Sequence, residues 1–201
     1  MEECIAFSEQ VGKRIAEEIG LPVYLYAKSA KVSSHIRLAD IRRGGYHTLR
    51  NAIRTEQDRA PDFGPHHLGR AGGVSVGARD FLIAFNVYLN VTDSAPARMI
   101  ARKIRQSSGG LPGVQAIGLQ VNGHAQVSMN LLDYRTTSLK DIFTAIQYEA
   151  KKLNCAPLYS ELIGMLPAAA LQGTSPDELM IRDFDSKRII ENRLPPIDKT
   201  H

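Results

Sequence analysis

Residues 81–90 read FLIAFNVYLN and residues 114–132 read VQAIGLQVNGHAQVSMNLL, and both stretches alternate with the two-residue period of a β-strand. In the first stretch every odd position is apolar, whereas Asn86 lies on the opposite face. In the second, Asn122 and Gly123 form a two-residue hairpin signal, because both positions of such a turn tolerate positive φ. The two stretches therefore predict one strand and one β-hairpin.

Two amphipathic helices are predicted beside these strands. The first begins near Ser94, with apolar residues at positions 97, 100, 101 and 104, the spacing of one helical face. The second begins at Ser138, where Asp141 three residues later completes a capping box. Residues 157–163 can supply a last strand. The order strand, helix, strand, strand, helix, strand is that of a ferredoxin-like βαββαβ domain, which places the fold in the α+β class.

In a ferredoxin-like domain the two helices cover one face of the sheet and leave the other face open. The polar positions of the predicted strands belong to the open face, and they are Asn86, Asn90, Gln126, Ser128 and Asn130. Their carboxamide and hydroxyl groups can satisfy the donors and acceptors of a polar ligand. They can equally well meet water, because antiparallel sheets commonly have one solvated face. The alternation of residues leaves both interpretations open.

The beginning of the chain has a different pattern. A helical stripe of apolar residues ends at Gly20, and residues 23–26, VYLY, read as a short strand that weaker helical stretches and a turn-rich segment follow. One helix and one strand cannot enclose a core, so the strand keeps unpaired edges unless a sheet from elsewhere covers them. We therefore divide the chain into residues 1–72, a second subdomain at residues 73–173, and a partly helical tail at residues 174–201.

Composition argues against several classes of function. The 201 residues include 25 Lys and Arg against 21 Asp and Glu, a formal net charge of +4. These charges form no clustered basic stripe of the kind that binds a nucleic-acid backbone. A sheet that binds RNA needs aromatic stacking platforms, and Tyr88 stands alone on the predicted central strands. Cys4 and Cys155 are too few and too far apart for a metal cluster, so we expect no metal.

The sequence also predicts the cellular location of the protein. Its apolar stretches are far shorter than the roughly 18 residues that a membrane-spanning helix needs. Residues 1–14, MEECIAFSEQVGKR, have two acidic residues before any basic one and no apolar central region, unlike a secretory signal. We therefore expect a cytoplasmic protein with neither a nucleic acid nor a membrane as its partner.

Several ungapped motifs along the chain carry a family resemblance. They are VYLY at residues 23–26, PDFGP at 61–65, RAGGVSVGARDFLIAFNVYL at 70–89, AQVSMNLLDY at 125–134 and DFDSKRIIENRL at 183–194. With these motifs in this order, the chain resembles the formiminotransferase family along essentially its whole length. The family comprises the glutamate formiminotransferases and the transferase half of the bifunctional formiminotransferase-cyclodeaminases.

The resemblance implies a cytoplasmic transferase of one-carbon metabolism. Such an enzyme moves the formimino group of N-formimino-L-glutamate onto N5 of tetrahydrofolate during histidine degradation, with tetrahydrofolate as co-substrate and without a metal. In the family, two similar αβ subdomains set their sheets facing one another, and the folate lies between them. A polar sheet face such as the one with Asn86, Gln126 and Asn130 is what this arrangement requires.

The family's folate-binding stretches correspond to two glycine-rich segments of this chain. The first comprises Gly64, Pro65, His66, His67, Leu68, Gly69, Arg70, Ala71, Gly72 and Gly73. The second comprises Gly109, Gly110, Leu111, Pro112, Gly113, Val114, Gln115, Ala116, Ile117 and Gly118. Glycine lets a backbone approach a flat pterin closely and aim its N–H groups at it. The alternative for both segments is ordinary turn chemistry.

The resemblance also implies that residues 1–72 are the C-terminal remnant of a similar first subdomain. The family's first subdomain begins upstream of the residue aligned with Met1, and the family's catalytic histidine lies in that upstream part. His66 and His67 do not align with it, so we read them as structural or ligand-lining residues, and the catalytic residue is unknown. The expected partner is the missing N-terminal subdomain or a second copy of the chain. The alternative to an enzyme is a non-catalytic folate-binding or interaction module.

Overall fold

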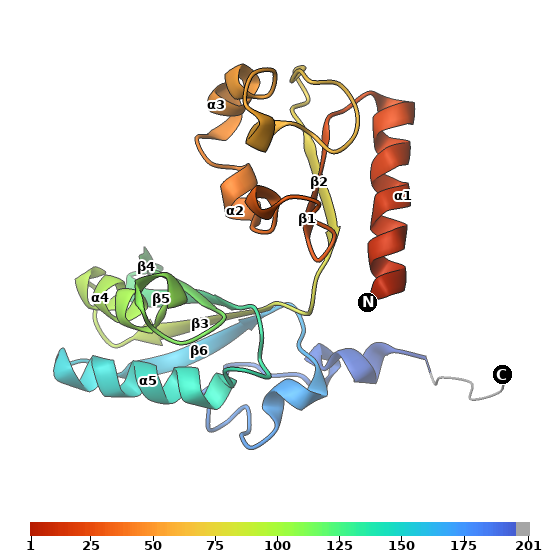
Figure 1. The fold of residues 1–201 in the computed structure, drawn as a ribbon. Coiled ribbons are helices and arrows are strands. Elements are labelled where there is room, and N and C mark those ends of the chain that lie inside the picture. Colours follow the sequence, from red (N-terminus) through yellow and green to blue (C-terminus); the bar gives the residue numbers. More distant parts are fainter. Residues whose placement is uncertain (196–201) are drawn as a thin grey trace. The chain divides into compact units, whose positions relative to one another are not determined.

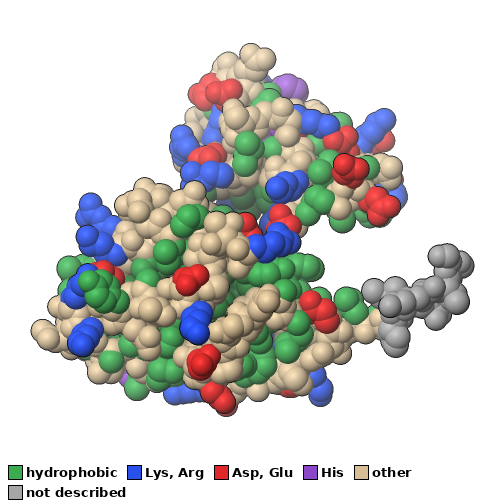
Figure 2. Space-filling view, turned by 60° about the horizontal axis from the view of Figure 1, so that its bottom comes forward, with side chains coloured by type: hydrophobic (Ala, Val, Ile, Leu, Met, Phe, Trp, Pro, Cys, Tyr) green, Lys and Arg blue, Asp and Glu red, His purple; other side chains and the backbone are tan. Residues whose placement is uncertain are grey.

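The computed structural model describes residues 1–195, and the chain divides into two compact units (Figure 1). The first unit is Met1–Arg79, and the second begins at Asp80. Both contain helices and strands, which confirms the predicted α+β class. No helix within residues 1–195 has the length and apolar character needed to cross a membrane. On the visible face of the space-filling view, acidic and basic side chains are interspersed (Figure 2).

The second unit has the predicted ferredoxin-like order. Its elements are β3 (Ile83–Leu89), α4 (Ala95–Ile104), β4 (Val114–Val121), β5 (His124–Leu131), α5 (Leu139–Lys152) and β6 (Pro157–Ile163). The strands form one antiparallel sheet in the order β4-β5-β3-β6. The hairpin turns at Asn122 and Gly123, which both have positive φ, as the sequence predicted.

The core of the second unit lies between this sheet and the two helices. Phe85 and Val87 of β3 are fully buried in one cluster with Ile100 of α4 and Ile142 of α5. The apolar alternation predicted for residues 81–90 is therefore correct from Ile83 on. It is wrong for Phe81, which precedes the strand and is 54% exposed.

The two helix starts differ in how they are capped. At α5 the Ser138 hydroxyl accepts from the Asp141 N–H at 3.1 Å, and the Asp141 carboxylate accepts from the Ser138 N–H at 3.1 Å. The predicted capping box is thus confirmed. At α4 the N-cap is Ser94, but its side chain makes no capping hydrogen bond. Asp93 instead accepts from the Ala95 N–H at 2.9 Å, so the acidic side chain caps the first turn.

The segment after β6 completes the same core. Ser160 of β6 donates its N–H to the carbonyl oxygen of Met180 at 2.7 Å and accepts from the Arg182 N–H at 3.0 Å. This pairing covers the outer edge of β6 and buries Leu179 and Ile181. The part of the predicted tail within residues 174–195 also contains two short 3-10 helices, whereas residues 196–201 lie outside the described residues.

The first unit is built on two parallel strands. β1 (Val23–Ala27) pairs with β2 (Val74–Ala78) in a two-stranded sheet, and α1 (Glu2–Ile19) lies alongside (Figure 1). The short helices α2 (Leu38–Ile41) and α3 (Gly45–Ala52) complete the unit. The sequence pattern predicts α1 and β1, whereas β2 was not predicted. The partner that β1 needs is thus supplied by residues just beyond the boundary predicted at residue 72.

Two layers pack on this small sheet. Gly12 of α1 lies against β1, where an added Cβ atom would be 3.2 Å from the Cγ1 atom of Val23. A separate cluster contains Tyr24 of β1 together with Ile41, Ile53 and Leu68. Because neighbouring residues of a strand point to opposite faces, Val23 and Tyr24 pack against these two layers respectively.

A buried carboxylate secures the outer edge of β1. Asp62 accepts from the Leu25 N–H at 2.8 Å and lies 3.2 Å from Nδ1 of His35. An ionised carboxylate can only accept, so Nδ1 of His35 donates to it. Leu25 and His35 are both buried, and Nε2 of His35 has no hydrogen-bond partner among the described residues. Asp62 therefore satisfies two donors that water cannot reach.

Gly118→Ala tests the packing of β4 against α4. The added Cβ atom would lie 2.1 Å from the backbone nitrogen of Arg98, a contact that no side-chain rotation relieves. We expect the free energy of unfolding of the second unit to fall by about 3 kcal/mol, as overpacking against backbone does. Urea denaturation followed by circular dichroism measures the loss. Gln115→Ala, an exposed position on the same strand, is the control and should cost less than about 1 kcal/mol. Equal losses for the two variants would refute the close contact.

Asp62→Ala tests the buried hydrogen bonds of the first unit. It leaves the Leu25 N–H and His35 Nδ1 without an acceptor, so we expect a loss of about 3 kcal/mol in the stability of that unit. Hydrogen exchange at the Leu25 amide should accelerate correspondingly. Asp62→Asn keeps one acceptor oxygen and should lose roughly half as much. Unchanged protection of the Leu25 amide in Asp62→Ala would contradict this assignment.

Candidate functional site

The open face is the side of the four-stranded sheet opposite α4 and α5. Strand register places its side chains in rows that cross the sheet. In the middle row, Ser128 and Asn86 stand between Ile117 at one end and Glu161 at the other. In the next row, Gln126 and Tyr88 stand between Leu119 and Tyr159. The face therefore combines a polar centre with apolar and aromatic borders.

The predicted polar face is accessible only in part. Asn86 and Asn130 are half-buried on the open face, so their amide groups can reach a ligand. Gln126, in contrast, is only 4% exposed. Its neighbours in the row are the bulky side chains of Tyr88 and Leu119, which leave little of the amide uncovered. The expectation that Gln126 contributes to an accessible surface is therefore corrected.

A carboxylate that sequence analysis missed lies at the end of the middle row. Glu161 of β6 accepts from the Asn86 side-chain amide at 3.4 Å and from the Tyr88 hydroxyl at 3.5 Å. Both distances are long for hydrogen bonds, so these contacts are weak. Burial, with the nearby Glu161 carboxylate as the second cause, raises the pKa of Tyr88. Tyr88 consequently remains a neutral hydroxyl donor at physiological pH.

An aromatic stack borders this carboxylate. The rings of Tyr88 and Tyr159 are nearly parallel at 20°, with their centroids 4.4 Å apart. The guanidinium carbon of Arg182 lies 3.5 Å from the centroid of the Tyr159 ring. Stacking and cation–π contacts of this kind restrict all three side chains. The stack thus gives the open face a rigid wall on the β6 side.

The period-2 pattern of β6 could have revealed Tyr159 and Glu161. Within residues 157–163, PLYSELI, the buried positions are Ser160 and Leu162. The positions that alternate with them, Tyr159 and Glu161, must share the open face with Asn86. Arg182 could not be found in this way, because it reaches the face through the pairing of a later segment with β6.

The first glycine-rich segment borders a cavity within the first unit. The cavity has a volume of about 340 Å³, and its lining includes Tyr24, Tyr46, Leu68, Gly72 and Gly73. The Tyr46 hydroxyl donates to the carbonyl oxygen of Gly69 at 3.0 Å. Burial raises the pKa of Tyr24 to about 12, so its hydroxyl stays a neutral donor, here to the carbonyl oxygen of Arg59 at 2.9 Å.

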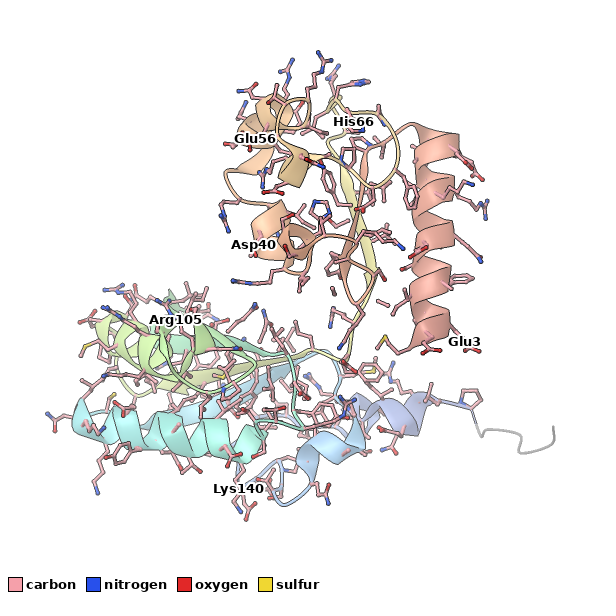
Figure 3. The ribbon with its side chains drawn as sticks, viewed as in Figure 1. Glu3, Asp40, Glu56, His66, Arg105 and Lys140 are labelled. Atoms are coloured by element: carbon pink, nitrogen blue, oxygen red, sulfur yellow. The ribbon has the colours of Figure 1, made fainter. Side chains whose placement is uncertain are left out.

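The other positions of this segment have separate roles. His66, labelled in Figure 3, is exposed, and so is His67; neither lines the cavity of about 340 Å³. Gly64 has a φ of +85°, and a Cβ atom there would lie 2.3 Å from the carbonyl oxygen of Leu21. Its glycine is therefore required by the backbone itself. The backbone conformation of the turn explains why residue 64 is glycine. Gly72 and Gly73, in contrast, line the cavity.

The second glycine-rich segment is half loop and half strand. Residues 109–113 form the loop, and β4 begins at Val114. Val114 and Ala116 point into the core beneath the helices, and Gly118 packs against α4, so these three side-chain positions cannot contact a ligand on the open face. Gln115 and Ile117 are exposed and do belong to the open face. Alternation along β4 thus separates the strand positions of this segment, residues 114–118, into a core group and an open-face group.

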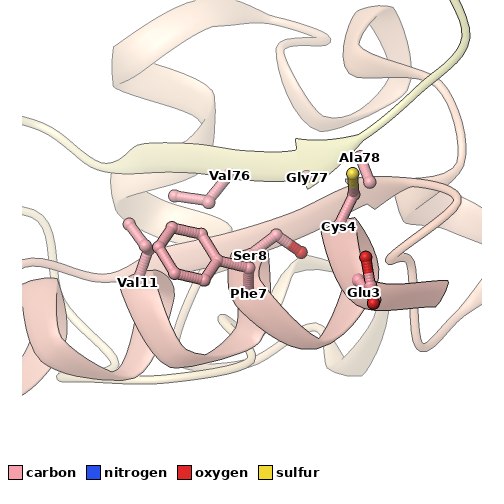
Figure 4. A pocket seen from close by; sticks show the side chains of 8 residues that line it. All are labelled: Glu3, Cys4, Phe7, Ser8, Val11, Val76, Gly77 and Ala78. Atoms are coloured by element: carbon pink, nitrogen blue, oxygen red, sulfur yellow. The ribbon is translucent and has the colours of Figure 1, made fainter. Parts of the chain in front are cut away.

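A trough of about 520 Å³ lies between α1 and β2 (Figure 4). Cys4, Phe7 and Val11 line it from the helix, and Val76 lines it from the strand. Phe7 is 67% exposed, whereas the positions of α1 that are buried are Ser8 and Gly12. The predicted apolar stripe of α1 is therefore only partly covered. Among the described residues, β1 is the only strand paired with β2.

The described residues contain no group of three His, Cys, Asp or Glu side chains arranged to hold a metal ion. Cys4 and Cys155 are free thiols, exposed and buried respectively. Burial raises the pKa of the Cys155 thiol, which keeps it protonated and unreactive near neutral pH.

Two family models match the chain. Residues 1–79 match the formiminotransferase domain, N-terminal subdomain, and residues 84–188 match the formiminotransferase domain. The boundary between these matches lies close to that between the two compact units.

Several curated proteins are similar to the chain in sequence. A glutamate formimidoyltransferase of Thermoplasma acidophilum is 38% identical over 198 residues, which cover 96% of this chain and 65% of the relative. One of Streptococcus pyogenes is 39% identical over 197 residues, covering 96% of this chain and 66% of the relative. A formimidoyltransferase-cyclodeaminase of Mus musculus is 36% identical over 209 residues, covering 96% of this chain and 38% of the relative.

The chain thus spans about two thirds of the length of the two glutamate formimidoyltransferases. Its two units match successive parts of one family, and the second has the ferredoxin-like topology that the motifs predicted. The chain belongs to the formiminotransferase family.

Proposed function

We propose that the open face of the second unit binds tetrahydrofolate, and that the chain takes part in transferring a formimino group from N-formimino-L-glutamate to N5 of tetrahydrofolate. The observation that carries this proposal is the row of Ser128, Asn86 and Glu161 on the sheet face opposite α4 and α5. Relatives named glutamate formimidoyltransferase support the reaction.

The chemistry of the open face suits a folate. A reduced pterin carries several N–H donors, a carbonyl acceptor and a flat ring. Asn86 and Asn130 supply both donors and acceptors, Ser128 supplies a hydroxyl, and Glu161 supplies acceptors. Ile117 provides an apolar border that can shield the ring from water. A polar centre with apolar edges is the usual composition of a small-molecule site.

The transfer exchanges one C–N bond for another. The N5 amine attacks the formimino carbon and forms a C–N bond, and the bond from that carbon to the glutamate nitrogen then breaks. The proton lost by N5 must reach the departing nitrogen, which leaves as the amine of glutamate. We assign this proton transfer to no residue of the chain. The open face would act by holding the pterin, so that N5 faces the formimino carbon.

We extend the proposal to parts of both glycine-rich segments. Gly72 and Gly73 border a cavity in the first unit, which supports a contact between this segment and a folate. The loop at residues 109–113, with Gln115 and Ile117, adjoins the open face in the second unit. A role in histidine degradation, a cytoplasmic location, and a further subdomain or second copy as partner stay predictions of the sequence.

Ser128→Leu tests the proposed binding surface. The leucine side chain would fill the middle row between Asn86 and Ile117, so we expect the dissociation constant for tetrahydrofolate to rise at least ~10-fold through lost polar contacts and steric exclusion. Isothermal titration calorimetry under anaerobic conditions measures it. Thr144→Leu places the same side chain on an exposed position of α5, on the other side of the sheet, and should bind as the wild type does.

Two results would contradict the proposal: a wild-type chain that does not bind tetrahydrofolate, or a Ser128→Leu variant that binds with unchanged affinity. Release of glutamate from N-formimino-L-glutamate, followed with glutamate dehydrogenase, separately tests the transfer. Folate binding without any glutamate release would favour the non-catalytic folate-binding module.

A further inference from the structure

The carboxylate of Glu161 has acceptor capacity that the described residues leave unused. The Asn86 amide and the Tyr88 hydroxyl both donate to the same oxygen, Oε2, at 3.4 Å and 3.5 Å. Oε1 has no hydrogen-bond partner among residues 1–195, and no Lys or Arg side chain there pairs with the carboxylate. A carboxylate has about four acceptor positions, so most of them here are available to a ligand.

The partial burial of Glu161 favours a ligand that donates hydrogen bonds to these available positions. Glu161 is half-buried, and a partly desolvated carboxylate without a cation is stabilised mainly by the N–H and O–H groups that donate to it. The two contacts, though weak, both come from β3, the neighbouring strand in the sheet. Tyr88 is itself restricted by its stack with Tyr159. The carboxylate is therefore partly oriented toward β3 before a ligand arrives, which lowers the entropic cost of binding.

A carboxylate pairs best with two parallel N–H donors. The guanidinium of arginine owes its strong bidentate pairing to donors on the two nitrogens of an N–C–N group. Both substrates of the proposed reaction contain such a group. The pterin carries it as its 2-amino group and the adjacent ring N–H, and N-formimino-L-glutamate carries it as a protonated amidine. Either could occupy the free positions of the Glu161 carboxylate.

We propose that Glu161 is a specificity-determining residue, which binds a substrate through the paired N–H donors of an N–C–N group. This inference rests on the proposed function and deepens it. Tyr88 acts as a positioning residue, because its hydroxyl contacts the carboxylate, and the Asn86 amide N–H contacts the same oxygen while the amide oxygen stays available to the ligand. The pterin and the formimino group share this chemistry, and the ligands of the experiment separate them.

The test compares Glu161→Gln with a matched control. Glutamine keeps the size of the side chain but offers one acceptor oxygen and no charge, so it cannot pair with two N–H donors. Glu149→Gln makes the same change on α5, where Glu149 pairs with Lys152. Calorimetry would measure the binding of tetrahydrofolate, p-aminobenzoyl-L-glutamate and N-formimino-L-glutamate to the full chain. p-Aminobenzoyl-L-glutamate is a folate fragment that lacks the pterin.

If Glu161 binds the pterin, Glu161→Gln should weaken tetrahydrofolate binding at least ~10-fold and leave p-aminobenzoyl-L-glutamate unaffected. If it binds the formimino group, the same loss should appear with N-formimino-L-glutamate instead. Glu149→Gln should bind every ligand as the wild type does. Glu161→Thr, which keeps a strand-forming residue without the carboxylate, should repeat the loss and serves if Glu161→Gln does not fold.

The outcomes separate this inference from the proposed function. Wild-type affinity for all ligands in Glu161→Gln or Glu161→Thr would overturn the role of Glu161 and leave the folate-binding proposal intact. An equal loss for p-aminobenzoyl-L-glutamate would also overturn it, because that ligand has no N–C–N group. A wild-type chain that binds neither substrate would overturn the proposed function and this inference together.

Discussion

Burial of one side of the four-stranded sheet is the constraint on which the second unit depends. Phe85 and Val87 of β3 are fully buried against helices α4 and α5. Because side chains alternate along a strand, this burial forces Asn86 and Tyr88 to the opposite side. Shifting β3 by one residue would exchange the two sets and place an amide in the core. The hydrophobic effect that folds the unit therefore also fixes which side chains point to the open face, where we place the folate site.

The same alternation explains the composition of the open face. Each strand contributes every second residue, so Ile117, Ser128, Asn86 and Glu161 meet in one row although they are far apart in the chain. The two rows differ in character. In one row Gln126 and Tyr88 are buried and Tyr88 stacks on Tyr159, whereas the Asn86 row carries a half-buried carboxylate with unused acceptors. We therefore propose the Asn86 row as the binding surface and the Tyr88 row as its border.

Local signals account for what the sequence predicted correctly. The hairpin at Asn122 and Gly123, the capping box at Ser138 and the buried side of β3 each depend on a few neighbouring residues. β2 was missed because Val74–Ala78 is short, contains a glycine and pairs with a strand about fifty residues earlier. The burial of Gln126 and the contact of Arg182 with Tyr159 both depend on residues that are distant in sequence and meet only in the folded chain. A pattern of neighbouring residues therefore cannot predict them. Each glycine-rich segment was predicted to bind folate along its whole length. In the second segment, β4 directs some side chains into the core and others to the open face.

We place tetrahydrofolate on the open face of the second unit. The NMR spectrum of the asparagine side-chain amides, recorded during titration with tetrahydrofolate, tests this placement residue by residue. We expect saturable shifts for the amides of Asn86 and Asn130, with Asn154, which follows α5, unchanged. Saturable binding that leaves both Asn86 and Asn130 unshifted would contradict it.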